Sequence, residues 1–306
     1  MAEKSNIAWC YGTYNHWFGC EKVSPACKHC YAEETVTKRM KLPVWGAHAP
    51  RKLSSPSNQK LPYAWNRAAI KEGVKRRIFC SSLSDVFEDR EELKPWRRDL
   101  FKMIEETQEG LVWMLLTKRA DKMASLAKEA GWEGTWPENV WAGVTVENKP
   151  TAIERVAHLL TLPLHETKGV RFVSMEPLLS PVDLTCLPCP GFLDSTFPDY
   201  FDALGGTTYY SDGEFNGNIN NLDWVIVGGE SGPHSRSSDL EWALDLRNQV
   251  HNTRMRDPRF FFKQTGAKPL LGGAPYPISD KKGQIWSEWP EELREQSLPT
   301  KFNPKI

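Results

Sequence analysis

The sequence has no long uninterrupted apolar run, little cysteine and no excess of either charge. None of its apolar stretches approaches the roughly 18 residues of a membrane-spanning helix, and residues 1–12 lack the basic and then apolar plan of a signal peptide. Seven cysteines in 306 residues are too few for a disulfide scaffold. We therefore expect a cytoplasmic protein without membrane contact, in which clustered cysteines serve metal binding or catalysis.

The net charge of zero argues against a protein whose whole surface binds nucleic acid. Residues 1–80, however, hold 14 Lys and Arg against five Glu and no Asp, a net charge of +9 that the remaining residues balance with −9. Lys and Arg interleaved with aromatic rings are typical of surfaces that hold unstacked bases. One interpretation is nucleic-acid contact through residues 1–80; the other is that the rings are core and the charges solvated.

Short apolar runs alternate with helical patterns from residue 78 onward, which is typical of βα units. Several runs show little polar alternation, as in parallel strands that are buried on both faces. The sequence predicts an α/β fold, a partial (β/α) barrel with about six to seven parallel strands. We expect strands at 77–80, 111–116, 140–144, 170–173, 224–227 and 260–262, with a seventh near 7–10, and helices at about 31–41, 63–73, 95–108, 120–130, 151–161 and 239–253.

The barrel is expected to take up residues 1–266, with a cysteine-bearing loop at 19–31. Residues 184–221 are rich in Gly, Pro, Asp and Asn, so we interpret them as an elaborated loop between two strands. Residues 267–306 are expected to form a carboxy-terminal tail that packs on the barrel.

Polar residues follow six of the expected strands, where ligand sites of parallel α/β folds lie. Taken singly, Ser, Thr, Asp and Gly also cap the helices that follow strands. Several charges at buried strand ends are costly without a partner or ligand, which favours an active site. The polar segments are residues 81–85, 117–119, 145–148, 174–177, 228–232 and 263–266.

Cys20, Cys27 and Cys30 have the spacing C-x6-C-x2-C. Three thiolates so placed can bind three irons of a [4Fe–4S] cluster and leave the fourth iron open for S-adenosylmethionine (SAM). One electron passed to the sulfonium of SAM then yields a 5′-deoxyadenosyl radical. The competing interpretation is a structural zinc site, with His29, His16 or Cys10 as the fourth ligand.

The commonest radical-SAM spacing is C-x3-C-x2-C, and the first gap is longer here. Further motifs follow in order along nearly the whole chain, at residues 17–20, 22–25, 27–33, 82–87, 116–119, 143–148, 171–179, 224–232 and 261–264. In these motifs the chain resembles the phage and prophage three-Cys-motif family, which is of unknown function and distantly similar to spore photoproduct lyase in the radical-SAM superfamily. The resemblance implies a partial barrel, a cluster on the three cysteines, SAM across the strand tops and a partner protein encoded nearby, but no particular reaction.

Candidate site residues come mainly from the strand ends. The glycine run at 228–232 lacks the lysine of a P-loop and the G-x-G-x-x-G pattern, so neither a nucleoside triphosphate nor a dinucleotide is supported. Candidates for cofactor binding are Tyr31, Ser82, Asp85, Thr117, Glu147, Glu176, Gly228, Gly229 and Glu230, without a choice among the acidic residues for SAM. Arg236, Arg119, Lys118 and Lys263 are candidates for binding a phosphate or carboxylate.

Four residues are candidates for a catalytic role: Cys10, Cys80, Lys118 and Lys263. The two cysteines end expected strands, and a thiol near the barrel mouth can return a hydrogen atom to a product radical. Burial as small hydrophobic residues explains them better. Cys186 and Cys189 form a C-x2-C pair in the elaborated loop, without a second pair nearby that would complete a zinc site.

These observations lead to three functional hypotheses. The first is a radical-SAM enzyme, supplied by an external electron donor, that modifies or repairs a nucleic acid or nucleotide. The second is a zinc-stabilised nucleic-acid-binding protein without catalysis. The third is a radical-SAM enzyme that acts on a small molecule or peptide.

Overall fold

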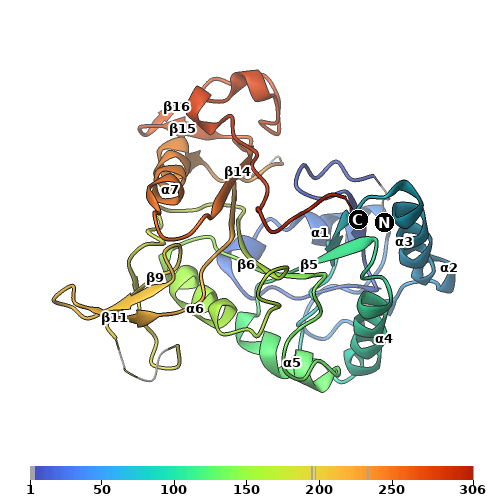
Figure 1. The fold of residues 1–306 in the computed structure, drawn as a ribbon. Coiled ribbons are helices and arrows are strands. Elements are labelled where there is room, and N and C mark those ends of the chain that lie inside the picture. The colour runs from blue at the N-terminus through green and yellow to red at the C-terminus, as the bar shows by residue number, and fades with distance from the viewer. Residues whose placement is uncertain (1–3, 194–195, 197, 233, 306) are drawn as a thin grey trace. The chain divides into compact units, whose positions relative to one another are not determined.

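The structure is a computed structural model that describes residues 4–193, 196, 198–232 and 234–305 (Figure 1). Its main sheet has seven parallel strands in the order β1-β4-β5-β6-β7-β12-β14. The predicted α/β fold with a partial (β/α) barrel is thereby confirmed. The strands are β1 (Gly12–Tyr14), β4 (Arg76–Cys80), β5 (Leu111–Thr117), β6 (Val140–Thr145), β7 (Val170–Met175), β12 (Trp224–Gly228) and β14 (Arg259–Gln264).

The chain divides into two compact units. The first comprises Met1–Gly143, Leu162–Val170 and Lys301–Ile306. The second comprises Val144–Thr161 and Arg171–Thr300. The expected division of the chain at residue 266 stays a prediction.

The first strand lies later in the chain than the sequence predicted. The apolar run at 7–10 forms turns, and Trp9 from it is buried and packs on Phe79 with ring centroids 4.8 Å apart. β1 instead pairs with β4, with Gly12 opposite Ile78. The prediction of a strand near residues 7–10 was therefore wrong, because an apolar run signals burial and not a particular backbone conformation.

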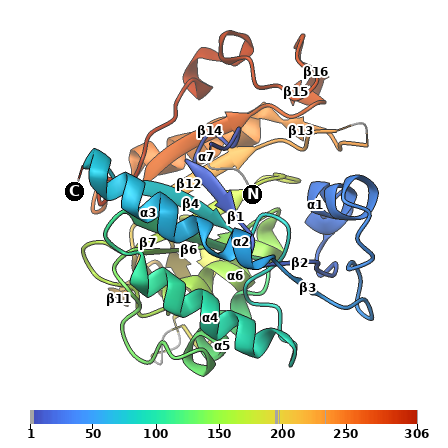
Figure 2. The ribbon, with the colours of Figure 1, turned by 90° about the vertical axis from the view of Figure 1, so that its right-hand side faces the viewer.

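The helices of the first unit follow the predicted positions closely (Figure 2). α3 ends at Gly73, whose φ of 66° is the left-handed conformation that commonly terminates helices. α1 continues directly into a π-helix at Thr35–Arg39. The elements are α1 (Tyr31–Glu34), α2 (Pro56–Gln59), α3 (Leu61–Glu72), α4 (Leu93–Glu106), a 3₁₀ turn at Ala120–Lys122 and α5 (Met123–Glu129).

Large aromatic rings fill the core of the first unit beside α4. Phe101 of this helix stacks on Trp132 with ring centroids 3.8 Å apart, and Trp132 in turn contacts Trp136 at 5.4 Å. All three rings are buried. Such rings bury large apolar areas, which stabilises the unit that carries the cysteine loop.

The second unit contains α6 (Lys149–Leu160) and α7 (Leu240–Asn252). α6 begins with a capping box in which Asn148 and Thr151 exchange hydrogen bonds with each other's backbone. α7 lies along β14 (Figure 1), and β13 (Ser238–Asp239), β15 (Pro269–Leu271) and β16 (Ala274–Pro275) form a three-stranded sheet. In the tail, Trp289 packs on Phe262 with centroids 5.0 Å apart.

The segment that we interpreted as an elaborated loop contains a small antiparallel sheet. Its strands run in the order β11-β10-β9-β8. With two to four residues each, they are too short to show the alternation from which a strand is predicted. They are β8 (Leu187–Pro188), β9 (Tyr200–Asp202), β10 (Thr207–Tyr209) and β11 (Phe215–Asn218).

Within the part of the chain that the structure describes, no helix combines the length and apolar character needed to cross a membrane. The expected cytoplasmic location stays a prediction.

Candidate functional site

The backbone on either side of Cys20 is held by two other loops. Cys20 follows β2 (Trp17–Phe18), which pairs with β3 (Lys52–Leu53). The N–H of the preceding Gly19 donates to the carbonyl of Leu83 at 3.1 Å, and the N–H of Gly46 donates to the carbonyl of Cys20 at 2.9 Å. The cysteine therefore lies at a point that is fixed relative to the loop that follows β4.

Gly19 is required at its position for two reasons. Its φ of 107° lies in the region that favours glycine. In addition, a Cβ built there would lie 2.2 Å from the carbonyl oxygen of Val44, which is closer than any real contact. The glycine of the Gly19-Cys20 motif thus lets the cysteine loop pack against its own returning segment.

Cys27 and Cys30 are held by the turn and the helix that follow Cys20 in sequence. Cys27 ends a 3₁₀ turn at Pro25–Cys27 and is buried, with its Sγ 3.7 Å from the hydroxyl of Ser24. Cys30 is the N-cap of α1. Burial raises the pKa of the Cys30 thiol; hydrogen bonds from the N–H groups of Glu33 and Ala32 and the charge of Lys118 act in the opposite direction.

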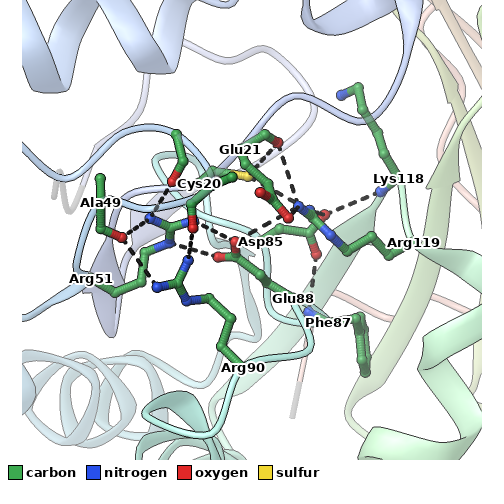
Figure 3. A network of polar contacts seen from close by, with 12 residues as sticks. Cys20, Glu21, Ala49, Arg51, Asp85, Phe87, Glu88, Arg90, Lys118 and Arg119 are labelled. Carbon is green, nitrogen blue, oxygen red and sulfur yellow. Dashed lines mark hydrogen bonds and ion pairs between the residues drawn. The ribbon is translucent and has the colours of Figure 1, made fainter.

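Arg119 connects the cysteine loop to the end of β5 (Figure 3). Its Nη1 donates to the Sγ of Cys20 at 3.6 Å and to Oδ2 of Asp85 at 2.9 Å, and its Nη2 donates to the carbonyl of Glu21 at 3.4 Å. Burial, followed by the charge of Asp85, raises the pKa of Cys20 to about 12, while the Arg119 guanidinium opposes that shift. Of the residues around Cys20, Arg119 is thus the one that favours its thiolate.

Asp85 uses both of its carboxylate oxygens within the protein. Oδ1 accepts from the N–H of Phe87 at 3.0 Å and from the hydroxyl of Thr117 at 2.7 Å. Oδ2 accepts from the N–H of Lys118 at 3.3 Å and from Arg119. The carboxylate is buried, so these four donors fill the acceptor positions that an ionised carboxylate offers.

A second buried ion pair, between Arg51 and Glu88, lies beside Arg119 (Figure 3). Arg51 donates through Nε to Glu88 at 2.8 Å and through Nη2 at 2.5 Å, which is the bidentate geometry. Nη1 of the same arginine donates to the carbonyls of Val44, Gly46 and Ala49. One side chain thus binds three carbonyls of the segment that returns from α1.

Tyr31 and Ser82, which we predicted as cofactor-binding residues, contact each other. The hydroxyl of Tyr31 donates to the carbonyl of Ser82 at 2.9 Å, while its side chain remains 57% exposed. Asn15, which is fully buried, donates to the Ser82 hydroxyl at 3.1 Å and accepts from the N–H of Leu83 at 2.6 Å. With Asp85 and Thr117, these residues gather at the cysteine loop in the first unit.

The other predicted cofactor residues belong to the second unit, where each carboxylate has a basic partner. Glu176 lies 3.1 Å from the ammonium of Lys263 and accepts from Ser174 at 3.2 Å. Glu230 accepts from Nε of Arg236 at 2.9 Å and from its Nη2 at 2.7 Å. Lys263 and Arg236, both candidates for binding a ligand carboxylate or phosphate, thus bind carboxylates of the chain itself.

Glu147 is a fully buried carboxylate of the second unit. Its Oε2 lies 2.8 Å from Nη1 of Arg155, which also donates to the carbonyl of Thr145. Its Oε1 has no hydrogen-bond partner among the residues that the structure describes. A buried oxygen without a donor is costly, so Glu147 retains acceptor capacity that the described chain does not use.

Gly228 and Gly229 are approached by the chain itself. A Cβ on Gly229 would lie 2.2 Å from the carbonyl oxygen of Thr265, and one on Gly228 would lie 2.8 Å from Oε1 of Glu176. Gly229 also exchanges hydrogen bonds with Gln264, at 3.1 Å through its N–H and at 3.0 Å through its carbonyl. Close backbone packing therefore accounts for both glycines.

The four cysteines outside the loop differ in accessibility. Cys10 and Cys80 are buried; the Cys80 thiol lies 3.5 Å from the Ser81 hydroxyl, and burial raises its pKa to about 12. Cys186 is exposed and Cys189 is half-buried, on either side of β8. The hydrogen-donor role of Cys10 and Cys80 stays a prediction, and their burial agrees with the simpler interpretation as small hydrophobic residues.

Most aromatic rings of the basic segment are core. Trp9, Tyr14, Trp17, Phe18, Trp65 and Phe79 are all buried, whereas Tyr31 is exposed. The segment's charges are placed differently: Lys28, Arg39, Lys41 and Lys52 are exposed, and no ion pair with another described residue involves them. Positive charge, more than stacking rings, is what this segment presents to solvent.

Within the described residues, no three His, Cys, Asp or Glu side chains are grouped so that they could hold one metal ion. A grouping of that kind is what a single ion such as zinc needs, because its ligand sulfurs all lie about 2.3 Å from the ion. In a [4Fe–4S] cube each thiolate binds a different iron. The side chains present fit such a cluster in their chemistry, because one loop supplies three thiols. The Arg119 guanidinium donates to the sulfur of Cys20, and the backbone N–H groups of Glu33 and Ala32 donate to the sulfur of Cys30.

Sequence comparison assigns the chain to a family. Residues 4–296 match the family described as "Protein of unknown function (DUF5131)", and the chain therefore belongs to it. No curated protein and no solved structure matches the chain significantly.

Proposed function

We propose that this protein is a radical-SAM enzyme whose [4Fe–4S] cluster is held by Cys20, Cys27 and Cys30. The observation that carries the proposal is the anchoring of one three-cysteine loop at the carboxyl ends of β4 and β5. Gly19 bonds to the loop after β4, and Arg119 from the end of β5 bonds to Cys20 and Glu21. In parallel α/β folds this end of the sheet is where catalysis takes place.

When bound, the cluster supplies one electron from an external low-potential donor to SAM, whose cleavage gives a 5′-deoxyadenosyl radical. The chain's own residues prepare the loop for this. Burial of Cys27 keeps bulk water from its sulfur, and Tyr31 ties the start of α1 to the Ser82 carbonyl. The charges of Arg119 and Lys118 offset the negative charge that three thiolates bring together.

Tyr31 and Ser82 are the cofactor-binding candidates that we retain beside the cysteines in the first unit. Tyr31 combines a fixed hydroxyl with an exposed ring, which suits contact with a flat adenine group. Glu147 is retained in the second unit, because its Oε1 is buried without a donor among the described residues.

We further propose a nucleic acid or nucleotide as the substrate. The support is the net charge of +9 in residues 1–80, together with exposed cations on and after the cysteine loop. Phosphate groups are the natural counterions of such a surface. We also propose a cytoplasmic location and a partner protein that is encoded by a neighbouring gene.

The test is anaerobic reconstitution with iron and sulfide, followed by incubation with dithionite and SAM. We expect about four irons per chain, a cluster spectrum and release of 5′-deoxyadenosine. Cys27→Ala should abolish the release, while Cys186→Ala, a matched change of an exposed cysteine, should leave it intact. Colourless protein that retains zinc would support the zinc-stabilised alternative instead.

A further inference from the structure

Arg119, just after β5, contacts the cysteine loop at its first cysteine. Its Nη1 donates to the Sγ of Cys20 at 3.6 Å, and its Nη2 donates to the carbonyl of Glu21 at 3.4 Å. The end of this strand thus supplies a cation to the first cysteine of the loop.

Arg119 is not free to move away from the sulfur. Its side chain is 10% exposed, and its guanidinium is paired with Asp85 at 2.9 Å and lies 3.8 Å from Glu88. Its backbone N–H also donates to the Thr117 hydroxyl at 2.9 Å, and that hydroxyl in turn donates to Asp85. A buried guanidinium is stable only with such partners; here they also fix its direction toward Cys20.

Asp85 therefore has a different role from the one that its place at a strand end suggested. With four donors on its carboxylate, it holds Arg119 and the backbone of Lys118 in place. It also brings a negative charge close to Cys20. The charge of Asp85 thus acts on a bound cluster in the direction opposite to that of the cation that it positions.

We propose that Arg119 raises the reduction potential of the cluster, and that Asp85 is a positioning residue that orients Arg119 and partly offsets its charge. This rests on the proposed function. Reduction by a low-potential one-electron donor adds one negative charge to the cluster, so a nearby positive charge stabilises the reduced form. Hydrogen bonds to the ligating sulfurs and local charge are established determinants of cluster potential.

The experiment is a reductive titration of the reconstituted protein under argon, monitored by the cluster's absorbance and electron paramagnetic resonance. At a fixed potential, we expect Arg119→Gln to lower the ratio of reduced to oxidised cluster about tenfold, which equals 59 mV for one electron. Asp85→Asn should raise that ratio, and the double variant should lie between the two. Arg119→Lys, which keeps the charge, should restore most of the loss.

Lys122→Gln is the matched control: its ammonium pairs at 3.8 Å with Asp89 and Asp121, and the ratio should not change. A purely structural role for these residues would affect stability but would not produce shifts of opposite sign.

The outcomes separate this inference from the proposed function. If wild-type protein assembles no cluster, the proposed function fails. If the cluster assembles and the Arg119 and Asp85 variants both keep the wild-type potential, this inference is overturned while the proposed function stands. Should Arg119→Gln fail to fold, Asp85→Asn still decides, since an unchanged potential in that variant would overturn the inference.

Discussion

Arg51 and Glu88 form a bidentate ion pair in which both side chains are almost completely buried, 37 residues apart in sequence. Both members of the pair make further polar contacts. Through Nη1, Arg51 also binds the carbonyls of Val44, Gly46 and Ala49, and Glu88 lies 3.8 Å from Arg119. Two buried charges therefore connect the segment after α1, the loop after β4 and the arginine that contacts Cys20.

Replacement of Arg51 by Met should lower the free energy of unfolding by about 3–5 kcal/mol, because it leaves the Glu88 carboxylate buried without its principal partner. Urea denaturation measures the change. Lys38→Met removes one member of the exposed pair with Glu34 and should cost at most about 0.5 kcal/mol. A loss below about 1 kcal/mol for Arg51→Met would show that this pair does not hold the loop.

Gly19→Ala should destabilise the cysteine loop far more than Gly46→Ala. Both glycines have positive φ, 107° and 112°, so both substitutions bear a backbone cost of about 1–3 kcal/mol. Only at Gly19 would the new Cβ meet the Val44 carbonyl at 2.2 Å, whereas nothing lies within 4 Å at Gly46. The check is limited proteolysis of residues 20–50, in which Gly19→Ala should be cut faster. Equal rates in the two variants would contradict the steric argument.

Much of the fold was predictable because parallel strands that are buried on both faces appear in sequence as continuous apolar runs. β5 illustrates this: the run 111–116 became Leu111–Thr117 with all but one residue buried. The first strand could not be located in this way. Its residues, Gly12 to Tyr14, are not an apolar run, and they form a strand only because β4 lies beside them. Such pairing is a long-range property.

The candidate site was predictable in its cysteines and in the polar strand ends, but not in the residues that hold them. The spacing of Cys20, Cys27 and Cys30 is a local pattern. The sequence does not show that Arg51 pairs with Glu88, or that Arg119 contacts Cys20 from 99 residues away. From sequence alone, any Arg or Glu is expected to lie on the surface. The one available signal was a set of charges beside apolar strand ends, which cannot identify partners.

Stability should fall on acidification through the protonation of His16. Burial lowers the pKa of this histidine from 6.5 to about 4, and its Nδ1 lies 2.8 Å from the hydroxyl of the buried Tyr14. Because the folded-state pKa lies below the unfolded value, the unfolded state binds the proton more tightly. The stability that neutral His16 contributes is therefore fully present above pH 6.5. As the pH falls toward 4, the free energy of unfolding decreases by up to about 3 kcal/mol.

The measurement is the urea midpoint of the metal-free protein between pH 7.5 and pH 4.5. His16→Gln should flatten the loss over that range relative to wild type, whereas His48→Gln, at an exposed position, should keep the wild-type slope. If His16→Gln retains the full pH dependence, other groups cause it.

Binding of single-stranded nucleic acid should weaken steeply with salt, because the exposed cations of residues 1–80 would each displace a counterion from phosphate. Each contact contributes about 0.7 to the slope of log K against log salt concentration. The double variant Lys28→Ala, Lys41→Ala removes two exposed charges and should reduce that slope by about 1.4. Fluorescence anisotropy with a labelled oligonucleotide measures it.

The matched control is Lys281→Ala, Lys282→Ala, which removes two equally exposed lysines from the second unit and changes the net charge of the chain by the same amount. If contact is confined to the first unit, this control keeps the wild-type slope. A general electrostatic attraction would instead reduce both slopes equally, and absence of binding at low salt would leave the small-molecule or peptide substrate as the better hypothesis. The comparison thus separates a docking surface from bulk charge, which a single affinity cannot do.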